Sequence, residues 1–98
     1  MEKIDKKRFV VVRTHTAGAF AGYLDKRDGK EVQLSAARRL WYWSGAASLS
    51  QLAVDGVKNP TDCKFPAPVN ITLTEAIEII ETTPTAQESI EAVKIWQS

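Results

Sequence analysis

Residues 37–49 constrain this chain most, because large aromatic rings are followed at once by a run of very small side chains. The segment reads Ala-Arg-Arg-Leu-Trp-Tyr-Trp-Ser-Gly-Ala-Ala-Ser-Leu and holds two of the three tryptophans. If it is extended, successive side chains point to opposite faces. The larger side chains then divide into two sets, Arg39, Trp41 and Trp43 on one face and Arg38, Leu40 and Tyr42 on the other.

This pairing of arginine with aromatic rings suits a planar anion such as a nucleotide. A guanidinium can grip phosphate or carboxylate with two hydrogen bonds, and an indole stacks on a base for about 1–3 kcal/mol. Gly45 and Ala46 would let a ligand approach the backbone, and Ser48 would cap a helix whose first N–H groups favour anions. The alternative is that most of these rings form the core of a short chain.

Composition and charge narrow the class of protein. Ninety-eight residues predict one domain, and 44% hydrophobic with 26% charged residues is ordinary for a globular protein. The 13 basic and 12 acidic side chains give a net charge of +1. A DNA-binding protein normally shows a basic excess, because its affinity depends on many phosphate contacts. We therefore expect no DNA partner, whereas a small anion in a local pocket needs only one or two arginines.

No pattern predicts catalysis, a metal site or a membrane segment. Cys63 is the single cysteine and His15 the single histidine, too few for an internal disulfide or a zinc cluster. The sequence holds no nucleophile elbow, P-loop or dinucleotide fingerprint. No apolar run approaches 18 residues, and the charged start lacks the apolar core of a signal peptide. The sequence predicts a cytosolic, non-enzymatic protein without cofactors.

Local patterns predict a single α+β domain at residues 8–98 behind a flexible N-terminus at residues 1–7. Strands are predicted at 9–14, 16–24, 31–34, 38–43 and 70–80, mostly where β-branched and aromatic residues gather. Asp28-Gly29 favours a hairpin turn at 26–30. Helices are predicted at 48–56, ending at Gly56, and from Thr83-Pro84 to Val93. Residues 58–68 hold three of the four prolines and predict an irregular loop.

The predicted strands are joined by short connections and indicate an antiparallel meander. The expected fold class is therefore a mostly antiparallel β-sheet with two short helices. We expect a monomer of this size to cover only one face of such a sheet. The second face, rich in Val, Ile and Trp, then predicts self-association, most simply through a two-fold interface.

Motifs spread over about residues 13–96 carry a resemblance to a known family. They are Thr14-His15-Thr16-Ala17-Gly18, Gly22, Gly29-Lys30-Glu31-Val32, Ala37-Arg38-Arg39-Leu40-Trp41-Tyr42-Trp43, Gly45-Ala46, Ser48-Leu49 and Cys63-Lys64-Phe65-Pro66. In these motifs the chain resembles a widespread family of small phage proteins, identified with the Thoeris anti-defence sponges. The resemblance implies a non-enzymatic homo-oligomer, dimeric at the ligand pocket or hexameric, that acts in the host cytoplasm.

The same resemblance implies a ligand and a set of contacts. The ligand is a cyclic ADP-ribose isomer or a cyclic oligonucleotide, held by aromatic stacking on adenine and by arginine contacts to phosphate. The candidate ligand-binding residues are Thr16, Gly18, Arg38, Arg39, Trp41, Tyr42, Trp43, Gly45, Ala46, Ser48 and Phe65. No arginine follows Arg39 in the chain, so a phosphate site built from C-terminal arginines would be missing.

Two hypotheses of other classes stay open. The first is a phage protein that binds and inhibits a host protein through the Trp- and Arg-rich segment, since Trp, Tyr and Arg dominate interaction hot spots. The second is a small structural phage protein. Titration with cyclic nucleotides distinguishes them, because a sponge releases its ligand intact when it is denatured by heat and an enzyme returns a changed ligand.

Overall fold

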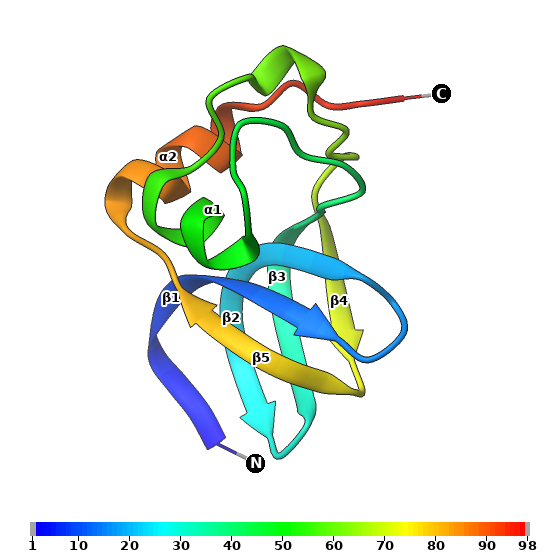
Figure 1. Cartoon of the computed structure of the whole chain (residues 1–98). Coiled ribbons are helices and arrows are strands. Elements are labelled where there is room, and N and C mark those ends of the chain that lie inside the picture. Colours follow the sequence, from blue (N-terminus) through cyan, green and yellow to red (C-terminus); the bar gives the residue numbers. More distant parts are fainter. Residues whose placement is uncertain (1, 98) are drawn as a thin grey trace.

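The computed structural model describes residues 2–97, with side chains from residue 7 onward. Within this range Figure 1 shows a five-stranded antiparallel sheet with two short helices on one side of it. The strands are β1 (Glu2–Thr14), β2 (Ala19–Asp28), β3 (Glu31–Arg39), β4 (Val69–Leu73) and β5 (Ala76–Glu81). The helices are α1 (Leu49–Asp55) and α2 (Pro84–Ala92), with a 3-10 turn, η1 (Pro60–Asp62), between them in the chain. The expected α+β class is confirmed.

The sheet is strongly curled, as its strand order requires. The order is β4-β3-β2-β1-β5, with antiparallel neighbours throughout. β4 and β5 therefore lie at opposite edges, although only Thr74 and Glu75 separate them in the chain. A flat sheet would hold these edges about 19 Å apart, four spacings of about 4.8 Å. Instead, the N–H of Ala76 at the start of β5 donates to the carbonyl oxygen of Lys30 in the β2–β3 turn at 2.9 Å.

The buried valines of β1 show that both faces of the sheet are covered. Val10, Val11 and Val12 are consecutive and have no exposed surface, although successive side chains in a strand point to opposite faces. Val10 and Val12 belong to a cluster inside the curl, with Phe20, Leu24, Val32, Leu34, Ala37 and Leu73. Val11 belongs to a second cluster under the helices, with Phe9, Leu52, Ala53, Phe65 and Ile90 among its members.

This arrangement overturns the sequence argument for self-association. That argument assumed that one chain covers only one face of its sheet, whereas the curl buries the inner face and α1 and α2 cover the outer one. Self-association itself stays a prediction. It can rest only on apolar side chains that are exposed in this chain, of which Trp41 is the most exposed, at 65%.

Both helices begin at the predicted capping residues. The Ser48 hydroxyl accepts the N–H of Gln51 at 3.1 Å, and Gly56 follows α1 with φ of 76°. The Thr83 hydroxyl accepts the N–H of Ala86 at 3.1 Å, and Pro84 occupies the first helical position. Residue-specific capping therefore placed both helices correctly, within a residue or two at each end.

The predicted strands at 31–34 and 38–43 are wrong as separate elements. β3 runs from Glu31 to Arg39 and contains both arginines of the pair. Its partner β2 begins at Ala19, whose carbonyl oxygen accepts the N–H of Leu40 at 2.9 Å. Beyond Leu40 neither neighbouring strand continues, so residues 41–43 leave the sheet as a loop. The proposed division of residues 38–43 between two sheet faces therefore fails after Leu40.

Other boundaries also differ from the sequence prediction. Residues 70–80 form two strands, because β4 pairs with β3 while β5 pairs with β1 at the other edge. β2 starts later than predicted, since residues 16–18 form the β1–β2 loop. The hairpin turn is centred on Gly29-Lys30, with Asp28 paired to Glu31 and Gly29 at φ of 59°. β1 begins at Glu2, residue 1 lies outside the described residues, and the flexibility of residues 1–7 stays a prediction.

Candidate functional site

Two segments far apart in the chain pair with each other, and the second of them also pairs with the C-terminal tail. Tyr42 and Lys64 exchange two backbone hydrogen bonds, from Tyr42 N to Lys64 O at 3.4 Å and from Lys64 N to Tyr42 O at 2.8 Å. Phe65 forms a parallel bridge with Ile95, and its carbonyl oxygen accepts the N–H of Trp96 at 3.0 Å. The aromatic segment that leaves the sheet thus finds new partners in the proline-rich loop, which in turn binds the tail.

This pairing places a cation close to one aromatic ring and on the same side of the chain as another. Residues directly opposite each other in an antiparallel pair share a face, so the side chains of Tyr42 and Lys64 lie on the same side. The Lys64 ammonium lies 5.6 Å from the ring centroid of Trp96, within the range of a cation–π contact. Tyr42 is 51% exposed, whereas Phe65 on the opposite side is fully buried. We call Tyr42, Lys64 and Trp96 the aromatic platform.

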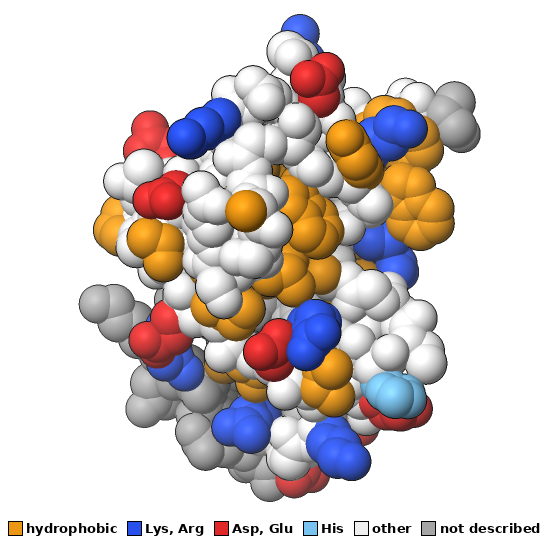
Figure 2. Space-filling model, in the orientation of Figure 1, with side chains coloured by type: hydrophobic (Ala, Val, Ile, Leu, Met, Phe, Trp, Pro, Cys, Tyr) orange, Lys and Arg blue, Asp and Glu red, His pale blue; other side chains and the backbone are white. Residues whose placement is uncertain are grey.

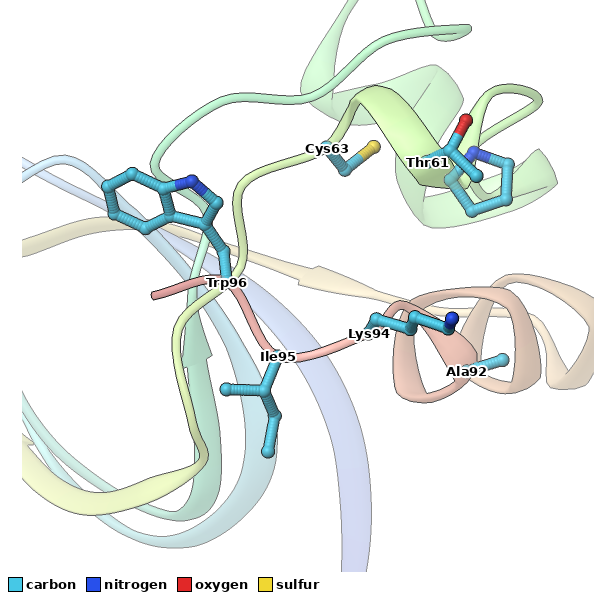
Figure 3. Close-up of a pocket in the computed structure, with 7 residues that line it drawn as sticks. Thr61, Cys63, Ala92, Lys94, Ile95 and Trp96 are labelled. Carbon is cyan, nitrogen blue, oxygen red and sulfur yellow. The ribbon is translucent and has the colours of Figure 1, made fainter. Parts of the chain in front are cut away.

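The platform borders a cavity through Trp96. The cavity has a volume of about 350 Å³ and is mostly apolar. Figure 3 shows how it lies between the η1 turn and the segment that follows α2. Its lining residues are Pro60, Thr61, Cys63, Ala92, Lys94, Ile95 and Trp96. Lys94 is the cation of this lining, and its side chain is exposed.

Exposed apolar side chains gather near the platform. Trp41 precedes Tyr42 in the chain and is 65% exposed, and Ile95 beside Trp96 is 53% exposed. Figure 2 shows hydrophobic side chains grouped around Lys or Arg side chains at the edge of the molecule next to the C-terminus. Large apolar side chains this exposed on a small protein commonly mark an interaction site.

Cys63 lines the cavity, but its thiol is buried. Its side chain is 6% exposed, and its sulfur accepts the N–H of Ser44 at 3.4 Å. The thiol also lies 3.6 Å from the carbonyl oxygen of Asn59. The sulfur is therefore packed between two backbone segments. Among the described residues, no group of three or more His, Cys, Asp or Glu side chains could hold a metal ion.

Arg38, one of the predicted ligand contacts, lies inside the protein. It is 4% exposed, and its guanidinium donates to backbone carbonyls of two segments. Nη2 donates to Phe65 O at 2.6 Å, Nε to Pro66 O at 2.9 Å and Nη1 to Val93 O at 2.8 Å. Val93 is the C-cap of α2, where the helix dipole favours a cation. Burial lowers the pKa of this guanidinium from its ordinary value.

Arg39, the other arginine, lies at a different site. Its guanidinium carbon is 4.5 Å from the ring centroid of the buried Phe20, and Nη1 donates to Ala17 O at 3.2 Å. With Thr16 it lines a cavity of about 200 Å³ that is separate from the first. Gly18, with φ of 91°, shapes the same loop, and its carbonyl oxygen accepts the hydroxyl of Thr14. The structure thus groups Thr16, Gly18 and Arg39 away from the aromatic platform.

The small-residue run is a packing segment. A Cβ on Gly45, whose φ is 91°, would lie 2.5 Å from the backbone nitrogen of Lys58. Ala46 is partly buried against the core cluster beneath the helices, and it lines neither of the two cavities described above. The N–H groups at the start of α1 are partly occupied, because Gln51 Oε1 accepts the N–H of Ala47 and Ser48 caps Gln51. A bulky Ala46→Glu change would meet the core, where a ligand was expected.

The remaining predicted residues divide between core and surface. Phe65 is fully buried, and Trp43 is partly buried against the same cluster. Trp41 and Tyr42 are exposed. The rings of the aromatic segment are therefore partly core and partly surface, and ligand contact by the exposed ones stays a prediction.

Sequence reasoning missed four residues of this region: Lys64, Lys94, Ile95 and Trp96. The available signal was the segment Lys94-Ile95-Trp96, which places two large apolar side chains directly after the predicted second helix. Chain ends that are exposed to solvent usually lack such side chains. Nothing local indicates that Lys64 stands opposite Tyr42, because 22 positions separate them and only the fold brings them together.

Comparisons with known proteins were made for the whole chain. The sequence model of one protein family, described as a domain of unknown function (DUF6948), matches residues 7–90. No curated protein matches the chain, and no solved structure does. Across the described residues, none of the helices is both long and apolar enough to cross a membrane.

Proposed function

Because this chain belongs to the DUF6948 family, whose description assigns no activity, we propose a function from its geometry: it is a phage anti-defence sponge. It binds a cyclic ADP-ribose-type or cyclic oligonucleotide immune signal in the host cytoplasm and holds it without cleavage. The resemblance of the sequence to the Thoeris anti-defence sponges supplies the ligand class. The aromatic platform supplies the contacts.

One observation carries this proposal: the Lys64 ammonium lies 5.6 Å from the ring centroid of Trp96, and Lys64 pairs through its backbone with the exposed Tyr42. A nucleotide combines a planar base with a phosphate, and this platform offers a ring for the base beside a cation for the phosphate. Stacking on one aromatic ring is worth about 1–3 kcal/mol. A cyclic oligonucleotide carries two or more such units, and a cyclic ADP-ribose isomer joins one adenine to two phosphates, so several weak contacts combine into tight binding.

The adjacent cavity has a suitable size and charge. Its volume of about 350 Å³ lies within the range of small-molecule sites, about 300–1,000 Å³. Lys94 in its lining adds a second cation near Trp96. A second copy of the chain facing the platform would enclose the ligand further. We therefore propose that the binding unit is a homo-oligomer, as the resemblance implies.

The test is sequestration followed by release. Purified protein is mixed with cyclic ADP-ribose isomers and with cyclic di- and trinucleotides, passed over a size-exclusion column and then denatured by heat. The proposal expects one ligand class to elute with the protein and to appear intact by mass spectrometry after heating. A ligand that returns chemically changed identifies an enzyme, and failure of every ligand to elute with the protein refutes the sponge.

Variants connect the result to the platform. Lys64→Gln and Tyr42→Ala should each weaken binding by at least about tenfold, since loss of a charged hydrogen bond or of a stacked ring costs more than 1 kcal/mol. Lys26→Gln is the matched control, because Lys26 is an exposed lysine of β2 with no place in the platform. Equal binding by Lys64→Gln and Lys26→Gln would place the ligand elsewhere.

The exposure of Trp41 favours a second candidate function. An indole that is 65% exposed and adjacent to Tyr42 in the chain is typical of a protein interaction hot spot. In this alternative the protein inhibits a host protein through the same surface. Lys64→Gln separates the two functions: it weakens nucleotide binding, whereas inhibition of a host protein through Trp41 persists.

A further inference from the structure

A second cavity lies where the β1–β2 loop meets the β4–β5 turn. Its volume is about 200 Å³, and it shares no lining residue with the cavity beside Trp96. Its lining includes the buried Phe20 and Leu73 and the exposed threonines Thr16, Thr72 and Thr74. The cavity therefore combines apolar and polar walls.

Arg39 is the cation of this cavity, and it is held in one orientation. Its guanidinium stacks on the buried ring of Phe20, with the carbon atom 4.5 Å from the ring centroid. Nη1 is fixed by the carbonyl oxygen of Ala17 at 3.2 Å. The edge formed by Nε and Nη2 makes no hydrogen bond to any side chain or carbonyl of the described residues, which leaves a two-donor fork.

Other arginines of the same sheet differ from Arg39 in their partners. Arg8 and Arg13 on β1 each pair with a glutamate of β5, Glu81 and Glu78. Among the side chains that the structure describes, Arg39 has no carboxylate within ion-pair distance. A guanidinium fork that is stacked, oriented and free of an intramolecular anion is pre-organised for two parallel hydrogen bonds to an oxyanion.

We propose that this cavity binds a small oxyanion, a phosphate or carboxylate group, on the Nε–Nη2 edge of Arg39. The threonine hydroxyls donate to the remaining oxygen atoms, and the volume admits a group the size of a phosphate monoester or a short carboxylic acid. The proposal is independent of the sponge function, because the two sites have no residue in common.

Glu75 offers a second way to change the anion affinity of the site, because its charge is opposite to that of Arg39. Glu75 is an exposed residue of the lining, and its backbone carbonyl oxygen accepts the N–H of His15 at 3.0 Å. A negative charge at the rim lowers the affinity for an anion. Removing this charge must therefore tighten binding, an effect that damage to the fold cannot imitate.

The test is an NMR titration of the full chain with inorganic phosphate and, separately, with acetate, at constant ionic strength. The Nε–H signal of Arg39 and the amide signals of Thr16 and Thr74 should shift and saturate with one or both probes. Which probe saturates distinguishes phosphate from carboxylate recognition. Shifts that rise without saturation, or that spread equally over all surface lysines and arginines, overturn the proposal.

Three variants complete the experiment. Arg39→Gln should weaken binding by at least about tenfold, the loss expected for charged hydrogen bonds. Glu75→Gln should tighten it by up to about fivefold, because one exposed like charge is removed. Arg27→Gln, the same change at an exposed arginine near the β2–β3 turn, should leave the affinity unchanged. Unchanged affinity in Arg39→Gln, or weaker binding in Glu75→Gln, would refute the assignment.

Discussion

Arg38 and Phe65 are joined by a buried hydrogen bond, 2.6 Å from guanidinium Nη2 to the carbonyl oxygen, across 27 positions of the chain. The same oxygen accepts the N–H of Trp96 at 3.0 Å. One carbonyl group thus ties the end of β3 to the tail that carries the aromatic platform. Arg38 is a positioning residue, since its cation binds the carbonyl groups of Pro66 and Val93 as well as that of Phe65.

The first prediction concerns this guanidinium. Arg38→Met should lower the free energy of unfolding by on the order of 3 kcal/mol, because several buried carbonyl groups lose a charged donor. Urea denaturation measures the change, and the indole N–H signal of Trp96 should broaden or move. Arg27→Met, a surface control, should stay within about 0.5 kcal/mol of the parent. A loss below about 1 kcal/mol for Arg38→Met would show that water replaces the guanidinium at little cost.

The second prediction concerns the close approach of β2 to β3. A Cβ on Gly22 would lie 2.8 Å from the Cα atom of Ala37 and 3.1 Å from the carbonyl oxygen of Ser35. Gly22→Ala should therefore destabilise the fold by about 1–3 kcal/mol, as overpacking does. Adding Ala37→Gly should restore only part of the loss, since the backbone contact persists. Full stability of Gly22→Ala in thermal unfolding would mean that the strands separate without cost.

The third prediction compares the two helix caps. The Thr83 hydroxyl accepts from Ala86 N and also donates to the carbonyl oxygen of Val54 at 2.6 Å, linking α2 to α1. Ser48 caps α1 alone. Thr83→Ala should thus cost more than Ser48→Ala, which should cost about 1 kcal/mol. Thr83→Ser keeps the hydroxyl and should stay near the parent. Equal losses in chemical denaturation for both alanine variants would show that the Val54 contact is not stabilising.

The fourth prediction is a pH dependence centred on Tyr23. Its hydroxyl donates to Glu91 at 2.9 Å, and this hydrogen bond, with burial and the charge of Glu91, raises the pKa of Tyr23 above its ordinary value of 10.0. The folded state then keeps a proton that the unfolded chain loses, so the contribution to stability is complete below pH 10.0 and disappears as pH rises through the raised pKa.

Alkaline denaturation checks this prediction with one variant. Tyr23→Phe keeps the edge-to-face contact with Phe9, whose ring centroid lies 5.2 Å away, and removes the ionisable group. Its free energy of unfolding should fall less steeply above pH 10 than that of the parent. Parallel curves for the two proteins would show that Tyr23 titrates normally.

The fifth prediction concerns self-association through the exposed rings. Trp41 and Ile95 are each more than half exposed, so a second copy that covers them gains apolar burial at about 25 cal/mol per Å². We expect a homo-oligomer at micromolar concentration in sedimentation velocity. Trp41→Ser should shift it toward a 10.9 kDa particle. Val54→Ser, at an exposed valine of α1, is the control that should leave the assembly intact.

The sequence by itself determined the elements that depend on neighbouring residues. Ser48, Gly56 and Thr83 predict helix ends because a cap bonds to N–H groups two or three positions away. Runs of β-branched residues predict strands for the same local reason. Fold class, both helices and the presence of a β2–β3 hairpin follow from such patterns.

Only the tertiary structure decided which aromatic rings and cations can contact a ligand or a partner. Arg38 and Arg39 are adjacent in sequence, yet one donates to core carbonyl groups and the other stacks on Phe20 at a cavity. The difference arises because adjacent strand residues face opposite sides, and the helices cover one side while the curl of the sheet leaves the other open at its end. Lys64 lies near Tyr42 and Trp96 only because the proline-rich loop folds back against the segment after β3 and against the C-terminal tail. Contacts of this range depend on chain closure, which no local pattern encodes.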